Sequence, residues 1–165
     1  PKELAHAEML TEWVRRLRPD ADEVLLLAAR AHHIRRWERP RSSYPEGRKG
    51  YLRWRTDLHK FHAREAGAIL EECGYDAATI ARVQQIISKH GLGRDLDVQS
   101  LEDALCLVFL DTQLTALIAD LPEETMVNVL RKTWKKMSEA AREHALAVEM
   151  RPSDREFVVR ALSDV

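Results

Sequence analysis

Histidine and aspartate side chains recur on the apolar faces of successive helical segments. Residues three, four and seven apart share one face of a helix, and by this spacing each candidate aligns with leucine, isoleucine, alanine or tryptophan. The candidates are His6, His33, His62, His90 and Asp111. A buried carboxylate is costly unless it is paired, hydrogen-bonded or bound to metal, and imidazole with carboxylate suits Fe, Mn or Zn. The pattern therefore predicts a buried metal site.

Each of these positions also has a structural interpretation. His90 precedes Gly91, where a cation would favour the C-terminus of a helix. His6 fits simple amphipathic packing, His33 fits a hydrogen-bonded core histidine, and Asp111 fits an ion pair with an arginine. The metal interpretation depends on whether these faces meet. The predicted metal ligands are His6, His33, His62 and Asp111.

Two adjacent carboxylates, Glu102 and Asp103, follow a predicted helix start at Ser100. Ser100-x-x-Asp103 matches a capping box, and the helix dipole favours acidic residues in a first turn. A catalytic role is the alternative, because Asp103 lies two turns before Asp111 on a nearby face. Glu102 and Asp103 are therefore the candidate catalytic residues.

Residues 35–60 form a basic segment in a chain whose formal net charge is only −1. The segment holds nine Lys or Arg and three acidic residues, a charge of +6, with two of the four tryptophans and two of the three tyrosines. Arginine offers a rigid donor fork for phosphate, and aromatic rings offer stacking surfaces. A solvated loop with Trp37 and Trp54 packed inward is one interpretation, and an anion-binding rim is the other. The predicted substrate-binding residues are Arg36, Arg41, Tyr44, Lys49, Trp54 and Arg55.

The elements that must position these residues are helical. No segment of useful length alternates as a half-buried strand does. The predicted helices cover about 3–17, 22–38, 51–73, 76–90, 100–119 and 123–150, with a short last helix from 152. Proline and glycine set most of their ends. We expect an all-α fold, a single compact domain over residues 1–165 with about six or seven helices.

Composition narrows the class of protein further. Hydrophobic residues make up 45% and charged residues 32% of the chain, which is typical of a globular protein. No apolar run reaches the roughly 20 residues that span a bilayer, so we expect no membrane partner. Cys73 and Cys106 fall within apolar helical patterns, which favours buried free thiols. A reducing, cytoplasmic location is the expectation.

Five stretches of the chain carry a resemblance to a known family. They are residues 31–37 (AHHIRRW), 40–45 (PRSSYP), 50–55 (GYLRWR), 101–110 (LEDALCLVFL) and 132–138 (KTWKKMS). Together they resemble an uncharacterised family, domain of unknown function 4202, over nearly the whole chain. The name of that family implies no activity.

A looser resemblance is to the HD-domain superfamily of metal-dependent phosphohydrolases. Residues 25–34 are similar to the helix that carries its His-Asp pair, residues 62–70 to the next helix, and residues 109–111 to the last-ligand helix. The resemblance implies an HD-like helical fold with His6 as first ligand. The defining pair reads His32-His33 here, and histidine in place of aspartate lowers the negative charge of the site.

Three functions follow from these observations. The first is an HD-like metal-dependent enzyme, a hydrolase that acts on a small phosphorylated or other anionic substrate such as a nucleotide. The second is a non-catalytic module that binds RNA or a nucleotide through residues 35–60. The third is a two-iron oxygenase, which keeps the metal and changes the chemistry. Metal content and the salt dependence of RNA affinity distinguish them.

Overall fold

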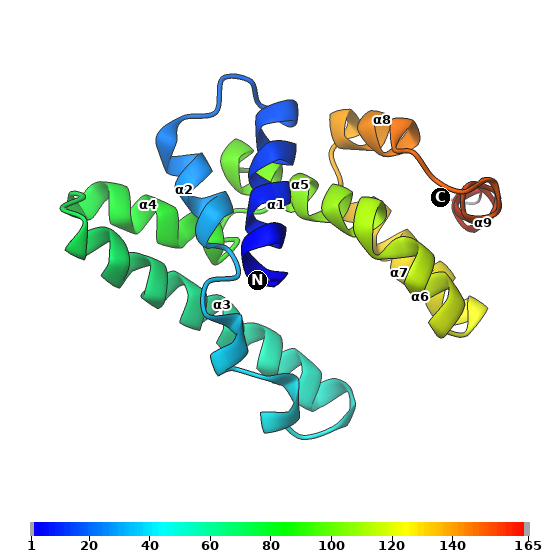
Figure 1. Ribbon diagram of the computed structural model, residues 1–165, viewed down its shortest axis with the longest axis horizontal. Coiled ribbons are helices and arrows are strands. Elements are labelled where there is room, and N and C mark those ends of the chain that lie inside the picture. The colour runs from blue at the N-terminus through cyan, green and yellow to red at the C-terminus, as the bar shows by residue number, and fades with distance from the viewer. Residues whose placement is uncertain (1, 164–165) are drawn as a thin grey trace. The chain divides into compact units, whose positions relative to one another are not determined.

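The computed structural model describes residues 2–163, and this range contains helices and no strand. The all-α prediction is therefore confirmed. Two compact units divide the chain, residues 1–101 and residues 102–165, which we call unit 1 and unit 2. Figure 1 labels the helices in chain order.

Unit 1 is built around four helices that pack through their apolar faces. They are α1 (Lys2–Leu17), α2 (Glu23–Ala31), α3 (Gly47–Glu72) and α4 (Ala77–Ile87). The neighbouring pairs are α1 with α2, α2 with α4, and α3 with α4, and Figure 1 shows α3 and α4 side by side. Asp22 accepts a hydrogen bond from the Leu25 amide at 2.9 Å, and Asp76 accepts one from the Thr79 amide at 2.9 Å. Both aspartates are N-caps that satisfy amides of a first helical turn.

The second helix ends earlier than its hydrophobic pattern predicts. α2 stops at Ala31, and the chain turns through residues 32–35, where Arg35 has a φ of +51°. Two 3-10 turns follow, η1 (Arg36–Glu38) and η2 (Arg41–Ser43). Trp37, which one interpretation of the basic segment packed inward and which lies within the helix predicted over 22–38, is 61% exposed. That prediction is wrong because a left-handed residue ends the helical register before Trp37.

Helix α5 (Leu96–Thr112) begins one turn before the predicted start at Ser100. Asp95 Oδ1 accepts hydrogen bonds from the amides of Asp97 at 3.0 Å and Val98 at 3.1 Å. Ser100 lies inside the helix, where its hydroxyl donates to the Leu96 carbonyl at 2.7 Å. The capping-box prediction for Ser100 and Asp103 is therefore wrong, because Asp95 satisfies the amides of the first turn.

Asp95 also supports a pH-dependent contribution to stability. Arg82 donates to its two carboxylate oxygens at 2.6 and 3.0 Å, and this pairing, with the amides of Val98 and Asp97, lowers the pKa of Asp95 to about 2. A depressed carboxyl pKa stabilises the fold above the unfolded value near 4 and stops doing so as pH falls through 2.

We expect Asp95→Asn to destabilise unit 1 by about 2 kcal/mol near neutral pH. The difference between wild type and variant should shrink by about 1 kcal/mol between pH 5 and pH 3, because protonation removes the same charge from the wild type. Urea unfolding at pH 7, 5, 4 and 3 measures this. A difference that stays constant over the whole range would contradict the proposed role of the carboxylate charge.

Unit 2 contains the rest of α5 and four shorter helices. They are α6 (Leu114–Asp120), α7 (Glu123–Lys136), α8 (Glu139–Ala147) and α9 (Pro152–Leu162). The single helix predicted over 123–150 is wrong, because α7 ends at Lys136 and Ser138 caps the start of the next helix, α8. Its hydroxyl oxygen accepts a hydrogen bond from the Ala141 amide at 3.2 Å. Serine competes with the helical backbone in this way where a new helix begins.

The cysteines differ in exposure. Both are free thiols, but only Cys106 is buried and Cys73 is exposed. Burial of Cys73 is therefore a wrong prediction, because this residue caps the C-terminus of α3. Among residues 2–163 none of the helices is both long and apolar enough to cross a membrane.

Candidate metal centre

Three imidazole rings converge in unit 1. His6 comes from α1, and His32 and His33 come from the turn that follows α2. One ring nitrogen of each lies within 4.8 Å of the others. The rings of His6 and His33 stack with centroids 4.4 Å apart and an interplanar angle of 13°, and the rings of His32 and His33 lie 4.6 Å apart. We call these three residues, with their neighbour His62, the histidine cluster.

Four buried nitrogens of the histidine cluster have no hydrogen-bond partner. They are His6 Nε2, both ring nitrogens of His32, and His62 Nε2. Within residues 2–163 they are the only buried side-chain nitrogen or oxygen atoms without one. Buried polar atoms in folded proteins are nearly always hydrogen-bonded, so this concentration marks the histidine cluster as a candidate binding site. Neutral imidazole nitrogens within a few ångströms of each other are suitable donors for a divalent transition-metal ion.

His62 is fixed in one tautomer by the backbone. Its Nδ1 lies 2.7 Å from the Ile34 carbonyl oxygen, which can only accept, so Nδ1 carries the proton. His62 Nε2 then has a free lone pair. A backbone carbonyl that holds the second nitrogen is the usual support of a metal-binding histidine. The ring centroid of His62 lies 5.8 Å from that of His33, at the edge of the three-histidine group.

Burial keeps the histidine cluster uncharged. Desolvation is the main cause that lowers the pKa of His33 to about 2 and the pKa of His62 to about 4. Burial likewise lowers the pKa of His6 and His32. Neighbouring histidines and Arg36 add to the effect on His33. Neutral imidazole is the form that binds metal, so no proton has to leave at neutral pH.

Arg36 brings a cation to the histidine cluster. Its Nη1 lies 3.3 Å from His33 Nε2, and its guanidinium lies 5.0 Å from the centre of the Trp54 ring. Burial is the main cause that lowers the pKa of Arg36, and the nearby charge of Arg55 adds to it. A partly desolvated guanidinium beside neutral imidazoles is a suitable anchor for an anion.

The other predicted substrate-binding residues lie on the same segment with different contacts. Trp54 donates its indole N–H to the Arg39 carbonyl at 2.9 Å. Arg55 donates to the Tyr51 hydroxyl at 3.2 Å. Arg41 donates a hydrogen bond to the backbone carbonyl of Tyr44 at 3.0 Å, and Lys49 is exposed. Of the six predicted substrate-binding residues, all within the described residues 2–163, Arg36 is the one that contacts a ring of the histidine cluster.

Asp111 does not have the burial that its pattern predicts. It lies in unit 2 and is exposed, one residue before α5 ends at Thr112. The apolar stripe on which it was placed crosses a helix end: α5 stops at Thr112, and the next stripe residue, Leu114, is buried in the separate helix α6. The predicted burial of this carboxylate is wrong, and its role as a metal ligand stays a prediction.

Glu102 and Asp103 are buried in unit 2 at 3% and 4% exposure. Glu102 accepts a hydrogen bond from Lys136 Nζ at 3.1 Å. Asp103 accepts two from Ser138, one from its amide at 2.9 Å and one from its hydroxyl at 2.5 Å. These bonds hold the junction between α7 and α8 against α5. Their catalytic role stays a prediction, and the geometry gives them a structural one.

His32 is the site residue that sequence reasoning missed. A helix that continued to Glu38 would leave His32 at the edge of the apolar face. Because α2 ends at Ala31, His32 instead lies in the turn and is only 5% exposed. The signal available in the sequence was the pair of consecutive histidines, which also stands where the HD resemblance places its defining pair.

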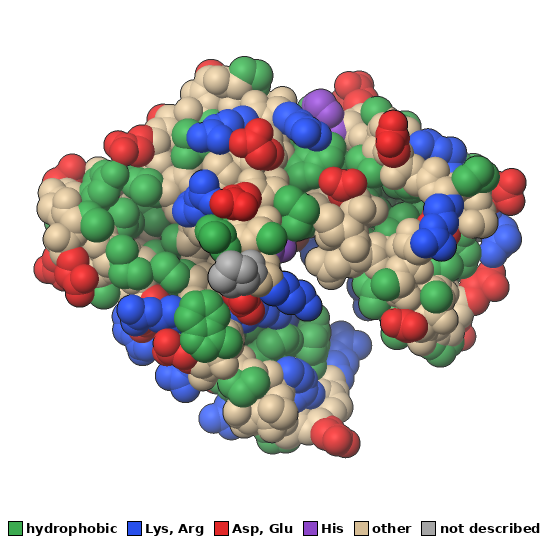
Figure 2. Space-filling view, in the orientation of Figure 1, with side chains coloured by type: hydrophobic (Ala, Val, Ile, Leu, Met, Phe, Trp, Pro, Cys, Tyr) green, Lys and Arg blue, Asp and Glu red, His purple; other side chains and the backbone are tan. Residues whose placement is uncertain are grey.

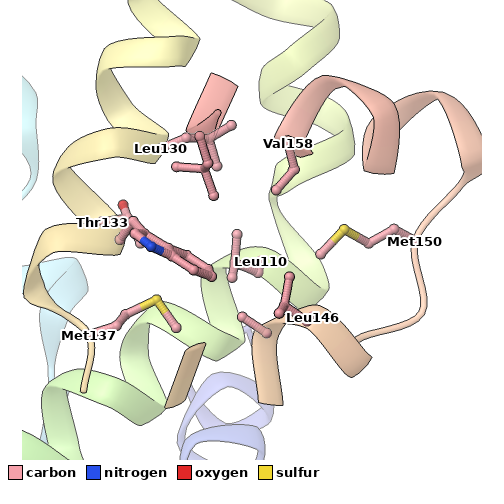
Figure 3. A pocket seen from close by; sticks show the side chains of 10 residues that line it. Leu110, Leu130, Thr133, Met137, Leu146, Met150 and Val158 are labelled. Atoms are coloured by element: carbon pink, nitrogen blue, oxygen red, sulfur yellow. The ribbon is translucent and has the colours of Figure 1, made fainter. Parts of the chain in front are cut away.

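A separate hollow lies in unit 2 and is shown in Figure 3. It has a volume of about 300 Å³, including its open side, and its lining includes Leu110, Trp134, Met137 and Met150. No charged side chain and no histidine lines it. The hollow therefore offers no group for acid-base or metal chemistry, and the histidine cluster remains the candidate site.

Comparison with known proteins agrees with the resemblance seen in the sequence. No curated protein and no solved structure matches the chain significantly. A family model matches residues 1–158, which include the whole histidine cluster and the basic segment. The chain belongs to the family described as Domain of unknown function (DUF4202).

Proposed function

We propose that this chain is an HD-like, metal-dependent enzyme, a hydrolase that acts on a small phosphorylated or other anionic substrate. The metal ligands in this proposal are His6, His32 and His33. The observation that carries it is the set of buried imidazole nitrogens without hydrogen-bond partners. One ring nitrogen of each of these three histidines lies within 4.8 Å of the others, and His6 and His32 both carry nitrogens without a hydrogen-bond partner.

The donor set narrows the choice of metal. All three grouped ligands are imidazoles, which suit Zn or Fe, whereas Mn prefers carboxylate and other oxygen donors. Three histidines and an open position are one arrangement of catalytic zinc sites. When bound, a divalent ion there supplies Lewis-acid activation of water and of a substrate oxygen. Because the ligands are neutral, the occupied site would carry a positive charge that favours an anion.

The residues around the proposed metal ligands would bind and orient the substrate. Arg36, 3.3 Å from His33 Nε2, would leave that nitrogen and donate its hydrogen bonds to an anionic substrate instead. Trp54 supports the guanidinium from one side. His62, with its proton fixed on Nδ1, offers Nε2 as a hydrogen-bond acceptor near the substrate. In this proposal these groups position the substrate.

Metal titration tests the proposal. Chain purified without a histidine tag and stripped with chelator should bind about one Zn²⁺ or Fe²⁺ per chain and should melt at a higher temperature when loaded, because a ligand that binds only the folded state stabilises it. Calorimetric titration and elemental analysis measure this. Absence of binding with both ions, and no rise in melting temperature, would overturn the proposal. Two iron ions per chain would replace the hydrolase by the two-iron oxygenase.

A further inference from the structure

The basic segment carries more positive charge than the chain itself neutralises. Of its nine Lys and Arg residues, Arg35 pairs with Glu65 at 2.8 Å, and Arg53 reaches Asp57 at 4.0 Å. The other seven have no carboxylate within 4.0 Å among residues 2–163. They are Arg36, Arg39, Arg41, Arg48, Lys49, Arg55 and Lys60. We call these seven residues, with Trp37 and Tyr51, the basic aromatic face.

The chain pairs arginines closely elsewhere in unit 1. Arg82 binds Asp95 at 2.6 Å and Asp97 at 2.7 Å, and Arg18 binds Asp20 at 2.9 Å. Carboxylates at similar spacing would have neutralised residues 36–60 in the same way. Unbalanced charge of one sign on one surface raises the local concentration of an oppositely charged partner. An anion is therefore the kind of partner that this charge favours.

The face is long enough for a polyanion. Arg48 and Lys60 both lie on α3, and twelve residues of helix cover about 18 Å. Figure 2 shows Lys and Arg side chains along the part of the molecule that α3 occupies in Figure 1. Arg48 and Lys49 lie in the first turn of α3, where the helix dipole disfavours cations. Helix stability therefore does not explain their presence.

Exposed aromatic rings accompany the cations. Trp37 is 61% exposed and Tyr51 is 42% exposed, although folding would normally bury such rings. The Arg55 guanidinium lies 5.9 Å from the centre of the Tyr51 ring. Flat exposed rings interleaved with guanidinium groups are the surface on which unpaired bases stack while their phosphates are held. Only a single strand presents bases in this way.

We propose that the basic aromatic face binds single-stranded RNA, with arginines on the phosphates and Trp37 and Tyr51 stacked on bases. This goes beyond the proposed metal-dependent reaction and does not depend on it. A lipid surface fits less well, because seven of the nine cations of residues 35–60 are arginines and Leu52 is the one exposed large aliphatic side chain of that segment. Arginine forks match phosphate, and membrane-binding faces present several aliphatic side chains.

Fluorescence anisotropy with a labelled 12-nucleotide single-stranded RNA tests the proposal, with chelator present so that the metal site has no part in it. Four or five phosphate contacts should give a slope of about −3 when log affinity is plotted against log salt, at about 0.7 per contact. The double charge reversal Arg48→Glu with Lys49→Glu should weaken binding at least tenfold. Trp37→Ala should weaken it about tenfold and leave the slope unchanged.

The matched control is Lys132→Glu with Lys135→Glu, which makes the same change of charge at two exposed residues of α7. The affinity of this control variant for the RNA should stay within twofold of wild type. Equal losses from both double variants would overturn the proposal, as would no RNA binding at low salt or duplex RNA that binds as well as the single strand. Binding to vesicles of anionic lipid without binding to RNA would also overturn it and identify a membrane surface.

Discussion

Replacing His33 by glutamine is expected to lower the affinity of the chain for Zn²⁺ by more than about a hundredfold. Mutation of a residue that only supports a metal ligand usually lowers metal affinity by less than this. The ring of His33 lies between those of His6 and His32, 4.4 and 4.6 Å away. Without it, two donors remain, and an ion of this kind needs at least three protein ligands in a stable site. Competition with a metal indicator measures the change.

The same variant separates a metal site from a purely structural cluster. The matched control is His90→Gln, because His90 is exposed and outside the grouped histidines. In chelator, His33→Gln should unfold at nearly the wild-type urea concentration, since the buried nitrogens of the cluster make few hydrogen bonds to lose. A large loss of stability in chelator, with unchanged zinc affinity, would show that the histidines serve packing alone.

Replacing Asp103 by alanine is expected to lower the free energy of unfolding by about 3 kcal/mol, within the range for removal of one partner from a buried charged network. Asp103 is 4% exposed and accepts from both the amide and the hydroxyl of Ser138. Its removal takes the acceptor away from that part-buried amide and loosens the residue that caps α8. Urea unfolding followed by circular dichroism gives the difference.

Asp103→Asn is the matched control for this prediction. The amide oxygen of asparagine can still accept from the Ser138 amide, and its NH₂ group can donate to the hydroxyl, so the loss should be about half as large. If Asp103 were catalytic and not structural, both variants would keep wild-type stability and lose turnover together. The two measurements therefore decide between the role predicted from the sequence and the role indicated by the contacts.

Helical periodicity predicts most of unit 1 because its residues alternate clearly between core and solvent. α1 and α3 lie close to their predicted limits, and His62 is buried at 2% exposure as its face predicts. Periodicity fails where a tertiary contact or a single backbone angle ends a helix. Neither the left-handed φ of Arg35 nor the cap at Asp95 alters the hydrophobic pattern of the flanking residues.

The candidate site shows the same limit. His6 and His33 lie close together in the structure, because both lie on or next to faces that α1 and α2 bury against each other; their role as metal ligands stays a prediction. The exposure of Asp111 could not be predicted from its apolar stripe, because the stripe does not show that the helix ends at Thr112. The burial of His32 could be predicted only if the end of α2 were already known. Residues at helix ends are therefore the ones that a periodic pattern assigns least well.

The position of the three histidines along the chain has a consequence for folding. His6 and His33 are 27 positions apart, so an ion shared between them would join two distant parts of the chain in the folded state and would leave when the chain unfolds. The stability that such an ion adds therefore increases with the concentration of free metal. An ion held by α1 and the turn after α2 would thus link these two elements reversibly, and chelation would return unit 1 to the stability of the metal-free chain.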